Sequence, residues 1–325
     1  MRRGRASDQQ GFALLAVTMV LAVLGVVVTE FAFAMRLETS MVRAYKQAIL
    51  ARHLAEAGIQ QAIREILSEA TIHGLDEDGQ VAFYRQAQSG ASPQRLPSLA
   101  RSRVALGEGE FSYRITDEEG RLNVNGGPDR VGKLLQALGL DKAARDAVVD
   151  AIEDWRDPND LHRPNGAESE DTYLQLPVPY RARNGNLQDP AELLQIKGVT
   201  PELYHGSEGK PGLGDLVTTR GRGSININTA PRQVLEAAGL AEAEISDVLQ
   251  ARVANPYRAA TGRFGGRRLG VNSATFRIES EGWLAGQPRL RIVAIVQRAG
   301  GGAGRGATVN IHGWRTLPPR RAAQG

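Results

Sequence analysis

A long apolar segment near the N-terminus constrains this chain more than any other feature. Residues 12 to 28 are apolar except for Thr18. Beyond them, apolar residues recur at spacings of three, four or seven as far as Ser68, which is the pattern of an amphipathic helix. No proline occurs before Pro93. The sequence therefore predicts one continuous helix from Phe12 to Ser68, roughly 85 Å long at a rise of 1.5 Å per residue.

The residues around this segment predict how it meets a membrane. Arg2, Arg3 and Arg5 precede the apolar run, and positive charge in this place predicts a cytoplasmic N-terminus and a body on the opposite side. Residues 12 to 35 are long enough to cross about 30 Å of hydrocarbon as a helix. The absence of cysteine suits an oxidising compartment but does not by itself assign one.

Two simpler interpretations of the N-terminus stay open at this point. It has the basic start and apolar core of a secretory signal peptide, and the AFA of Ala32 to Ala34 resembles a cleavage site. It could also be a plain single-pass anchor. The apolar run is longer than the roughly 7–15 residues of a signal peptide, and neither interpretation requires the amphipathic continuation.

The leader resembles that of the type IV prepilins, in which a short basic segment ends in glycine and is followed by phenylalanine and an apolar helix. The resemblance implies that a prepilin peptidase cuts between Gly11 and Phe12 and methylates the new amino terminus. Most prepilins carry glutamate at the fifth mature position, where this chain has Ala16. Because the glutamate is thought to pair with a neighbouring subunit, its absence implies a subunit less suited to join a filament from below.

Small residues in the apolar helix favour close packing against other helices in a membrane. We expect such contacts at these positions: Ala13, Ala16, Ala22 and Gly25.

Strand patterns lie at two places far apart in the chain. The first is residues 110 to 125, predicted as a strand, a turn at Glu118 to Gly120 and a second short strand. The others follow near the C-terminus, with hairpin connections at Ala285 to Pro288 and Gly300 to Gly306; they are Thr275 to Trp283, Leu290 to Arg298 and Gly306 to Trp314.

Between these strands the sequence predicts short helices and loops. Pro190 and Pro231 suit the first turn of a helix. The candidate helices are Arg130 to Leu138, Lys142 to Trp155, Pro190 to Ile196, Arg232 to Ala238 and Glu242 to Ala254. Residues 71 to 109 are predicted as a connector with one short helical candidate near Val81 to Gln88.

The predicted fold is α+β, with a long N-terminal helix, a pilin-like antiparallel sheet and a large helical insertion of the SAM-like or helix-hairpin-helix kind. The expected ranges are a leader at 1–11, a transmembrane half-helix at 12–35, an amphipathic half-helix at 36–70, a sheet subdomain from 71–125 with 271–325, and the insertion at 126–270.

Four further stretches resemble the K-type minor pseudopilins of type II secretion systems. They are DEEGRLNVN (Asp117 to Asn125), DAIEDWRDPND (Asp150 to Asp160), PNGAESEDTY (Pro164 to Tyr173) and ININTAPRQVL (Ile225 to Leu235). Together with the leader they extend over nearly the whole chain in the family's order. The resemblance implies a non-enzymatic structural protein of the bacterial inner membrane with a periplasmic body at the tip of the pseudopilus. The implied partners are the I-type and J-type minor pseudopilins, the prepilin peptidase and the major pseudopilin filament.

An acidic segment, residues 153 to 171, supplies many oxygen ligands within a short distance along the chain. Calcium takes six to eight such ligands, although the spacing is not that of an EF-hand. A solvated acidic loop is the alternative. The family resemblance implies a structural Ca²⁺ here, and the favoured ligands are Asp157, Asp160, Glu168 and Asp171.

The alternative function is that of a membrane-anchored helix-hairpin-helix DNA-binding protein for DNA uptake. Residues 225 to 254 have the pattern of such a hairpin, but Ala241 stands where a second glycine would help, and Glu242 and Glu244 would repel phosphate. The formal charge of +4 and the 5% aromatic content also disfavour a nucleic-acid partner. An exported hydrolase is disfavoured because the sequence shows no grouping of nucleophile and base.

Overall fold

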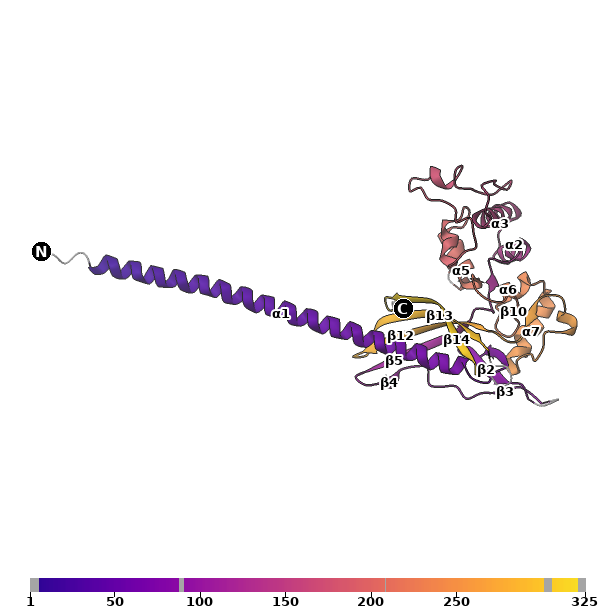
Figure 1. The fold of residues 1–325 in the computed structure, drawn as a ribbon, viewed down its shortest axis with the longest axis horizontal. Helices are drawn as coiled ribbons and strands as arrows, with labels where there is room; N and C mark the ends of the chain where they lie inside the picture. The colour runs from indigo at the N-terminus through magenta and orange to yellow at the C-terminus, as the bar shows by residue number, and fades with distance from the viewer. Residues whose placement is uncertain (1–5, 88–90, 208, 301–305, 321–325) are drawn as a thin grey trace.

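One helix sets the shape of the molecule. The computed structural model describes residues 6–87, 91–207, 209–300 and 306–320. In it, helix α1 runs without a break over Ala6–Ile66, which confirms the predicted single helix. Figure 1 shows that its first part extends far from the rest of the protein, and that only its last turns lie on the body.

The body is built on an antiparallel sheet of five strands in the order β14-β13-β12-β5-β4. Side chains of β12 alternate between buried and partly buried, as expected for a sheet with one covered face. The three C-terminal strands and the turn at Ala285 are confirmed, whereas most of the predicted loop after Gly300 lies outside the described residues. The strands are β4 (Val104–Leu106), β5 (Gly109–Asp117), β12 (Thr275–Leu284), β13 (Gln287–Ala299) and β14 (Thr308–Leu317).

The covered face of this sheet packs on the C-terminal part of α1. The helix residues that are buried there recur every three or four positions, so they form one stripe along the helix. They are Ala51, Leu54, Ala55, Ile59, Ala62 and Ile66. The helix and the sheet approach so closely that a Cβ atom on Gly282 of β12 would lie 2.0 Å from the carbonyl oxygen of Ala51. Only glycine fits at this contact.

The predicted short helix near Val81 to Gln88 is wrong. Residues Val81–Arg85 form strand β2, which pairs antiparallel with β1 (Ile72–Leu75) and with β3 (Gln94–Arg95), while Gln88 lies outside the described residues. Val81 and Phe83 are buried in the sheet core together with the end of α1. Tertiary pairing therefore decides the conformation of a segment whose own pattern is ambiguous.

A second body, mostly helical, is inserted between β5 and β12 and has its own hydrophobic core. The predicted helices are confirmed, with the segment at Pro190 forming a 3₁₀ helix, while α4 and α5 were not anticipated. The α-helices are α2 (Pro128–Ala137), α3 (Lys142–Arg156), α4 (Pro201–His205), α5 (Leu213–Leu216), α6 (Arg232–Ala237) and α7 (Glu242–Ala254).

Short elements connect these helices. The 3₁₀ helices are η1 (Tyr173–Gln175), η2 (Pro190–Gln195) and η3 (Gly262–Phe264). The two-residue strands are β6 (Leu122–Asn123), β7 (Gly206–Ser207), β8 (Lys210–Pro211), β9 (Val217–Thr218), β10 (Ile225–Asn226) and β11 (Leu269–Gly270). The predicted second strand after Gly120 is β6, but it pairs in parallel with β9 rather than with β5.

The insertion contains the same helix hairpin twice. Helices α2 and α3 are joined through Gly139, and helices α6 and α7 through Gly239 one hundred positions later. The two glycines have φ angles of 91° and 88°, in the left-handed region that ends helices. The sequences LQALGL and LEAAGL around them agree at four of six positions, so the duplication has a signal in the sequence, although it was not predicted.

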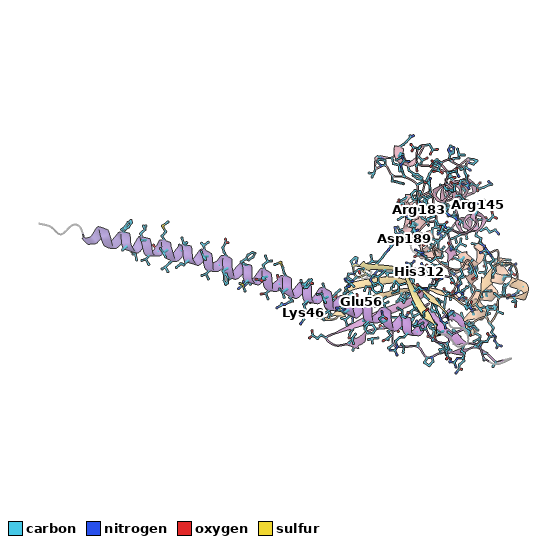
Figure 2. All side chains as sticks on the ribbon, in the orientation of Figure 1. Lys46, Glu56, Arg145, Arg183, Asp189 and His312 are labelled. Atoms are coloured by element: carbon cyan, nitrogen blue, oxygen red, sulfur yellow. The ribbon has the colours of Figure 1, made fainter. Side chains whose placement is uncertain are left out.

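The insertion lies at the end of the molecule remote from the N-terminus (Figure 1). The insertion also contacts the sheet directly, because Arg315 of β14 forms an ion pair with Asp189, the residue before η2. Figure 2 shows Asp189 on the insertion side, above the part of the sheet where His312 lies. The fold class is α+β, as predicted.

Replacing Gly282 by alanine tests the close contact between α1 and the sheet. We expect the added methyl group to lower the free energy of unfolding by about 1–3 kcal/mol, because it overlaps the helix backbone. The measurement is urea denaturation of the full chain in detergent, followed by circular dichroism. The matched control is Gly313→Ala on β14, where the new Cβ would lie 3.7 Å from Ile295, an ordinary contact. Equal stability of the two variants would contradict the close contact between Gly282 and α1.

Candidate functional site

The N-terminal half of α1 is an apolar helix that packs on no other described part of the chain. It is long and apolar enough to cross a membrane, by length and composition. Its large apolar side chains are exposed, with Phe12 at 75% and Phe31 at 67%. Gly11 and Phe12, the predicted cleavage residues, both lie in the first two turns of this helix. An apolar surface of this length requires lipid or other helices around it.

The four small residues predicted for helix packing do not form one stripe. Because α1 is a regular helix here, residues nine positions apart point in opposite directions, two and a half turns along. Ala13 and Ala16 therefore lie on one side, and Ala22 and Gly25 on the other. A Cβ on Gly25 would meet no atom of this chain within 4 Å. The helix offers two separate faces for close approach.

The acidic segment after α3 is organised by Asp154, which sequence reasoning did not place among the favoured ligands. This residue is fully buried in the last turns of α3. Its Oδ2 accepts hydrogen bonds from the backbone N–H groups of Arg163 (3.0 Å) and Ala167 (2.9 Å). The Arg163 guanidinium donates to Asp154 Oδ1 (2.8 Å) and to Asp157 Oδ2 (2.9 Å). Asp154 thus folds the loop back onto the helix.

Glu168 lies inside this fold without a counter-charge. The residue is 2% exposed, and neither of its carboxylate oxygens has a hydrogen-bond partner among the described residues. Burial raises the pKa of Glu168 to about 7, with a further contribution from the negative charges of Asp154, Asp157 and Asp160. A buried carboxylate surrounded by other carboxylates is unfavourable unless a proton or a cation neutralises it.

The structure brings together some of the four predicted ligands. Asp157 and Asp160 are electrostatic neighbours of Glu168, although Asp160 also accepts a hydrogen bond from Asn184 (3.1 Å). Asp171 is engaged elsewhere, since its carboxylate accepts from the Glu168 backbone and pairs with His162 at 2.9 Å. Within the described ranges, no three acidic or histidine side chains are already arranged as ligands of one ion.

A second buried polar cluster joins the insertion to the sheet. Asp117, the last residue of β5, accepts hydrogen bonds on Oδ2 from three side chains. The donors are Ser273 (2.6 Å), Thr229 (2.6 Å) and Asn226 (3.0 Å). Asn226 also donates to the backbone carbonyl of His73. Because these groups are buried and far apart in sequence, the cluster fixes how the insertion is seated.

This cluster contains the residue types of a hydrolase triad but not its geometry. Ser273 Oγ donates to Asp117 rather than to His73, and His73 Nδ1 accepts from the Ser273 backbone N–H at 2.9 Å. All three side chains are buried. The serine therefore has no base to activate it and no access to substrate.

The second helix hairpin has the shape expected for the DNA-binding alternative but not its charge. Glu242 and Glu244 lie in the first turn of α7, and Glu244 accepts the backbone N–H of Ala241. That N–H would otherwise be available to a phosphate oxygen. The Glu244 carboxylate thus occupies the N–H group that a phosphate would need, which favours a scaffold role for the hairpin.

Comparisons with known proteins all point to one family. A family model described as "Type II secretion system (T2SS), protein K" matches residues 117–207. Type II secretion system protein K of Pectobacterium carotovorum is 30% identical over 31% of this chain and 36% of its own length. Type II secretion system protein K of Pseudomonas aeruginosa is 29% identical over 61% of this chain and 59% of its own length. Residues 117–207 of this chain therefore match the type II secretion protein K family.

Other comparisons agree with this assignment. A putative type II secretion system protein K of Escherichia coli K12 is 27% identical over 61% of this chain and 60% of its own length. The chain thus aligns with less than two thirds of each of these three K proteins. In the crystal structure of the GspK-GspI-GspJ complex from enterotoxigenic Escherichia coli, one chain matches with a TM-score of 0.62 at 19% identity, covering 87% of this chain and 100% of that chain. This match shows a shared fold.

The polar cluster makes the body of the protein sensitive to acid. Burial, together with the positive charge of Arg298, lowers the pKa of His73 to about 3. An unfolded chain takes up a proton on this histidine near pH 6.5, whereas the folded protein does so only near pH 3, so stability is full above pH 6.5 and is lost as pH falls.

We expect His73→Gln to remove about 2 kcal/mol of the stability difference between pH 7.5 and pH 5. Urea denaturation at the two pH values measures it. The control His205→Gln changes an exposed histidine of α4 and should keep the wild-type pH dependence. An unchanged pH dependence in His73→Gln would contradict a neutral, buried imidazole.

Proposed function

We propose that this protein is a structural minor pseudopilin that starts and caps the pseudopilus of a type II secretion system. The observation that carries the proposal is the division of α1. Its apolar half is exposed along its whole length, while its last turns, from Ala51 onward, are built into the core of the sheet. Such a helix can leave lipid and pack among the helices of other subunits without changing the folded body.

The capping role rests on the shape of the molecule and on Ala16. The insertion lies at the end remote from the N-terminus, where the next subunit of a stack would have to sit (Figure 1). Ala16 carries no carboxylate to pair with the amino terminus of a subunit above it. Both features suit a subunit that has neighbours below it only.

The proposed partners are the I-type and J-type minor pseudopilins. In the solved complex from enterotoxigenic Escherichia coli, GspK is bound to GspI and GspJ. The opposite small-residue faces of α1, Ala13 with Ala16 and Ala22 with Gly25, agree with contacts to two different helices. By the same proposal, the major pseudopilin filament grows beneath this complex, and the body lies on the periplasmic side of the inner membrane.

Maturation is the step that tests the proposal. We expect a prepilin peptidase to cut between Gly11 and Phe12, and the mature chain to begin with N-methylated Phe12. Gly11→Leu should leave the leader attached and reduce recovery of a complex with the I-type and J-type proteins by at least about tenfold, because an unprocessed subunit stays in lipid.

Intact mass and co-purification from membranes provide the two measurements. Gly4→Leu, a glycine change inside the leader, is the matched control and should be processed normally. A wild-type chain that is uncut, or cut after Ala34, would overturn the pseudopilin assignment.

We further propose that the acidic segment of the insertion binds a structural Ca²⁺. Support comes from Glu168, whose two buried oxygens have no partner among the described residues and whose neighbours are three aspartates. Oxygen ligands of this kind suit calcium. Glu168 would supply ligand oxygens together with Asp157 and Asp160; Asp171, favoured from the sequence, would join them only if it releases His162.

Calcium should therefore stabilise the insertion. At a concentration one hundred times its Kd, bound calcium adds about 2.7 kcal/mol, and the unfolding temperature of the full chain in detergent should rise by about 5 °C relative to chelator. Glu168→Gln should abolish this rise.

The control is Glu170→Gln, two positions away, which changes an exposed glutamate paired with Arg181 and should keep the effect. Identical melting curves with calcium and with chelator in the wild-type chain would sink the calcium proposal without affecting the pseudopilin one.

A further inference from the structure

A cavity of about 450 Å³ opens where the chain passes between the sheet and the insertion. Three parts of the chain line it: residues 118–130, which lead into α2, the loop of residues 220–225, and Arg268 beside β11. This region is distinct from the acidic segment around Glu168. Its lining contains five arginines, namely Arg121, Arg130, Arg220, Arg222 and Arg268.

The acidic residues of the lining do not balance these arginines. Glu118 is already neutralised, because Arg277 donates to its Oε1 at 2.7 Å and Arg121 lies 3.4 Å away. Burial, with a contribution from the charge of Asp117, raises the pKa of Glu119 to about 7, so this side chain is partly protonated at neutral pH. Asp129, which is exposed, is the remaining carboxylate of the lining.

Three guanidinium groups remain available. In the part of the chain that the structure describes, no side-chain hydrogen bond or ion pair engages Arg220, Arg222 or Arg268. Arg130 is held by a hydrogen bond from its Nη2 to the Arg267 carbonyl (3.0 Å), and burial together with the charge of Arg268 lowers its pKa. Arg222 is attracted electrostatically to Glu119, and the arginines of the cavity still outnumber its carboxylates.

The backbone conformation around the cavity also indicates a binding site. Arg268 has a φ angle of 51°, in the left-handed region that a non-glycine residue rarely adopts. The conformation is held by a hydrogen bond from the Ile225 N–H to the Arg268 carbonyl (3.0 Å). Strained residues of this kind concentrate at binding sites. In addition, α2 starts at the cavity, and its N-cap residue Gly127 has no side chain to accept the first free N–H groups.

The geometry points to a binding site for a small polyvalent oxyanion, a phosphate or carboxylate compound, held by Arg220, Arg222 and Arg268. Guanidinium groups bind both kinds of oxyanion in pairs of hydrogen bonds. The volume falls within the range of small-molecule sites, about 300–1,000 Å³, which favours a compact ligand over a folded surface. A bound anion would also tie together residues 118–130, the loop of residues 220–225 and Arg268, which lie far apart in the chain. The inference does not depend on the proposed assembly role.

Titration calorimetry of the full chain in detergent at low salt tests this site. Inorganic phosphate, pyrophosphate and citrate are titrated separately. We expect one saturable site, with pyrophosphate or citrate bound more tightly than phosphate because each carries more charge. Tighter binding of pyrophosphate would assign the ligand to phosphate compounds, and tighter binding of citrate to polycarboxylates.

Variants locate the binding. The double variant Arg220→Gln, Arg222→Gln should weaken binding at least about tenfold, since each substitution removes charge-assisted hydrogen bonds to the anion. Arg268→Gln is a second variant that should also weaken binding, and it keeps the test valid if the double variant unfolds. The control Arg289→Gln removes an exposed charge from β13 outside the cavity. Absence of saturable binding by all three anions, or wild-type affinity in both cavity variants, would overturn the inference.

Discussion

The contact between the last turns of α1 and the five-stranded sheet is the interaction on which the rest of the structure depends. Ala51, Ala55 and Ala62 are small enough to let the helix lie directly on the strands, and Ile59 and Ile66 fill the space between them. The same helix continues beyond this contact with its apolar residues exposed. One regular element therefore has two environments, a protein core at one end and lipid or other helices at the other, and the body is held at a fixed position on it.

Local sequence patterns were sufficient to predict elements that are stabilised locally or whose buried and exposed residues alternate clearly. The unbroken apolar period predicted α1, and the bounds predicted for α7 agree with those observed. The strand β2 was predicted as a helix because Val81, Ala82 and Phe83 are all buried, which removes the alternation that marks a strand. Short parallel pairs such as β6 with β9 were not predicted either, because no local pattern encodes a pairing over nearly one hundred residues.

The candidate sites also divide into features that local sequence predicts and features that depend on the tertiary fold. Composition alone directed attention to the acidic segment, but it could not distinguish Asp154 from Glu168. The Asp154 carboxylate holds the loop through backbone hydrogen bonds, whereas the Glu168 carboxylate has no hydrogen-bond partner among the described residues. The difference depends on burial, and burial depends on how the loop returns to α3. The cluster around Asp117 was hidden for a related reason, since its partners Asn226 and Ser273 are more than one hundred positions away.

The seating of the insertion has a mechanical consequence. The insertion is joined to the sheet by the buried hydrogen bonds of Asp117 and by the ion pair between Asp189 and Arg315. A load applied to the outer end of the protein is therefore shared among several attachments instead of being taken by a flexible linker. It passes through β5 and β12 into α1, because both strands pack on the last turns of that helix.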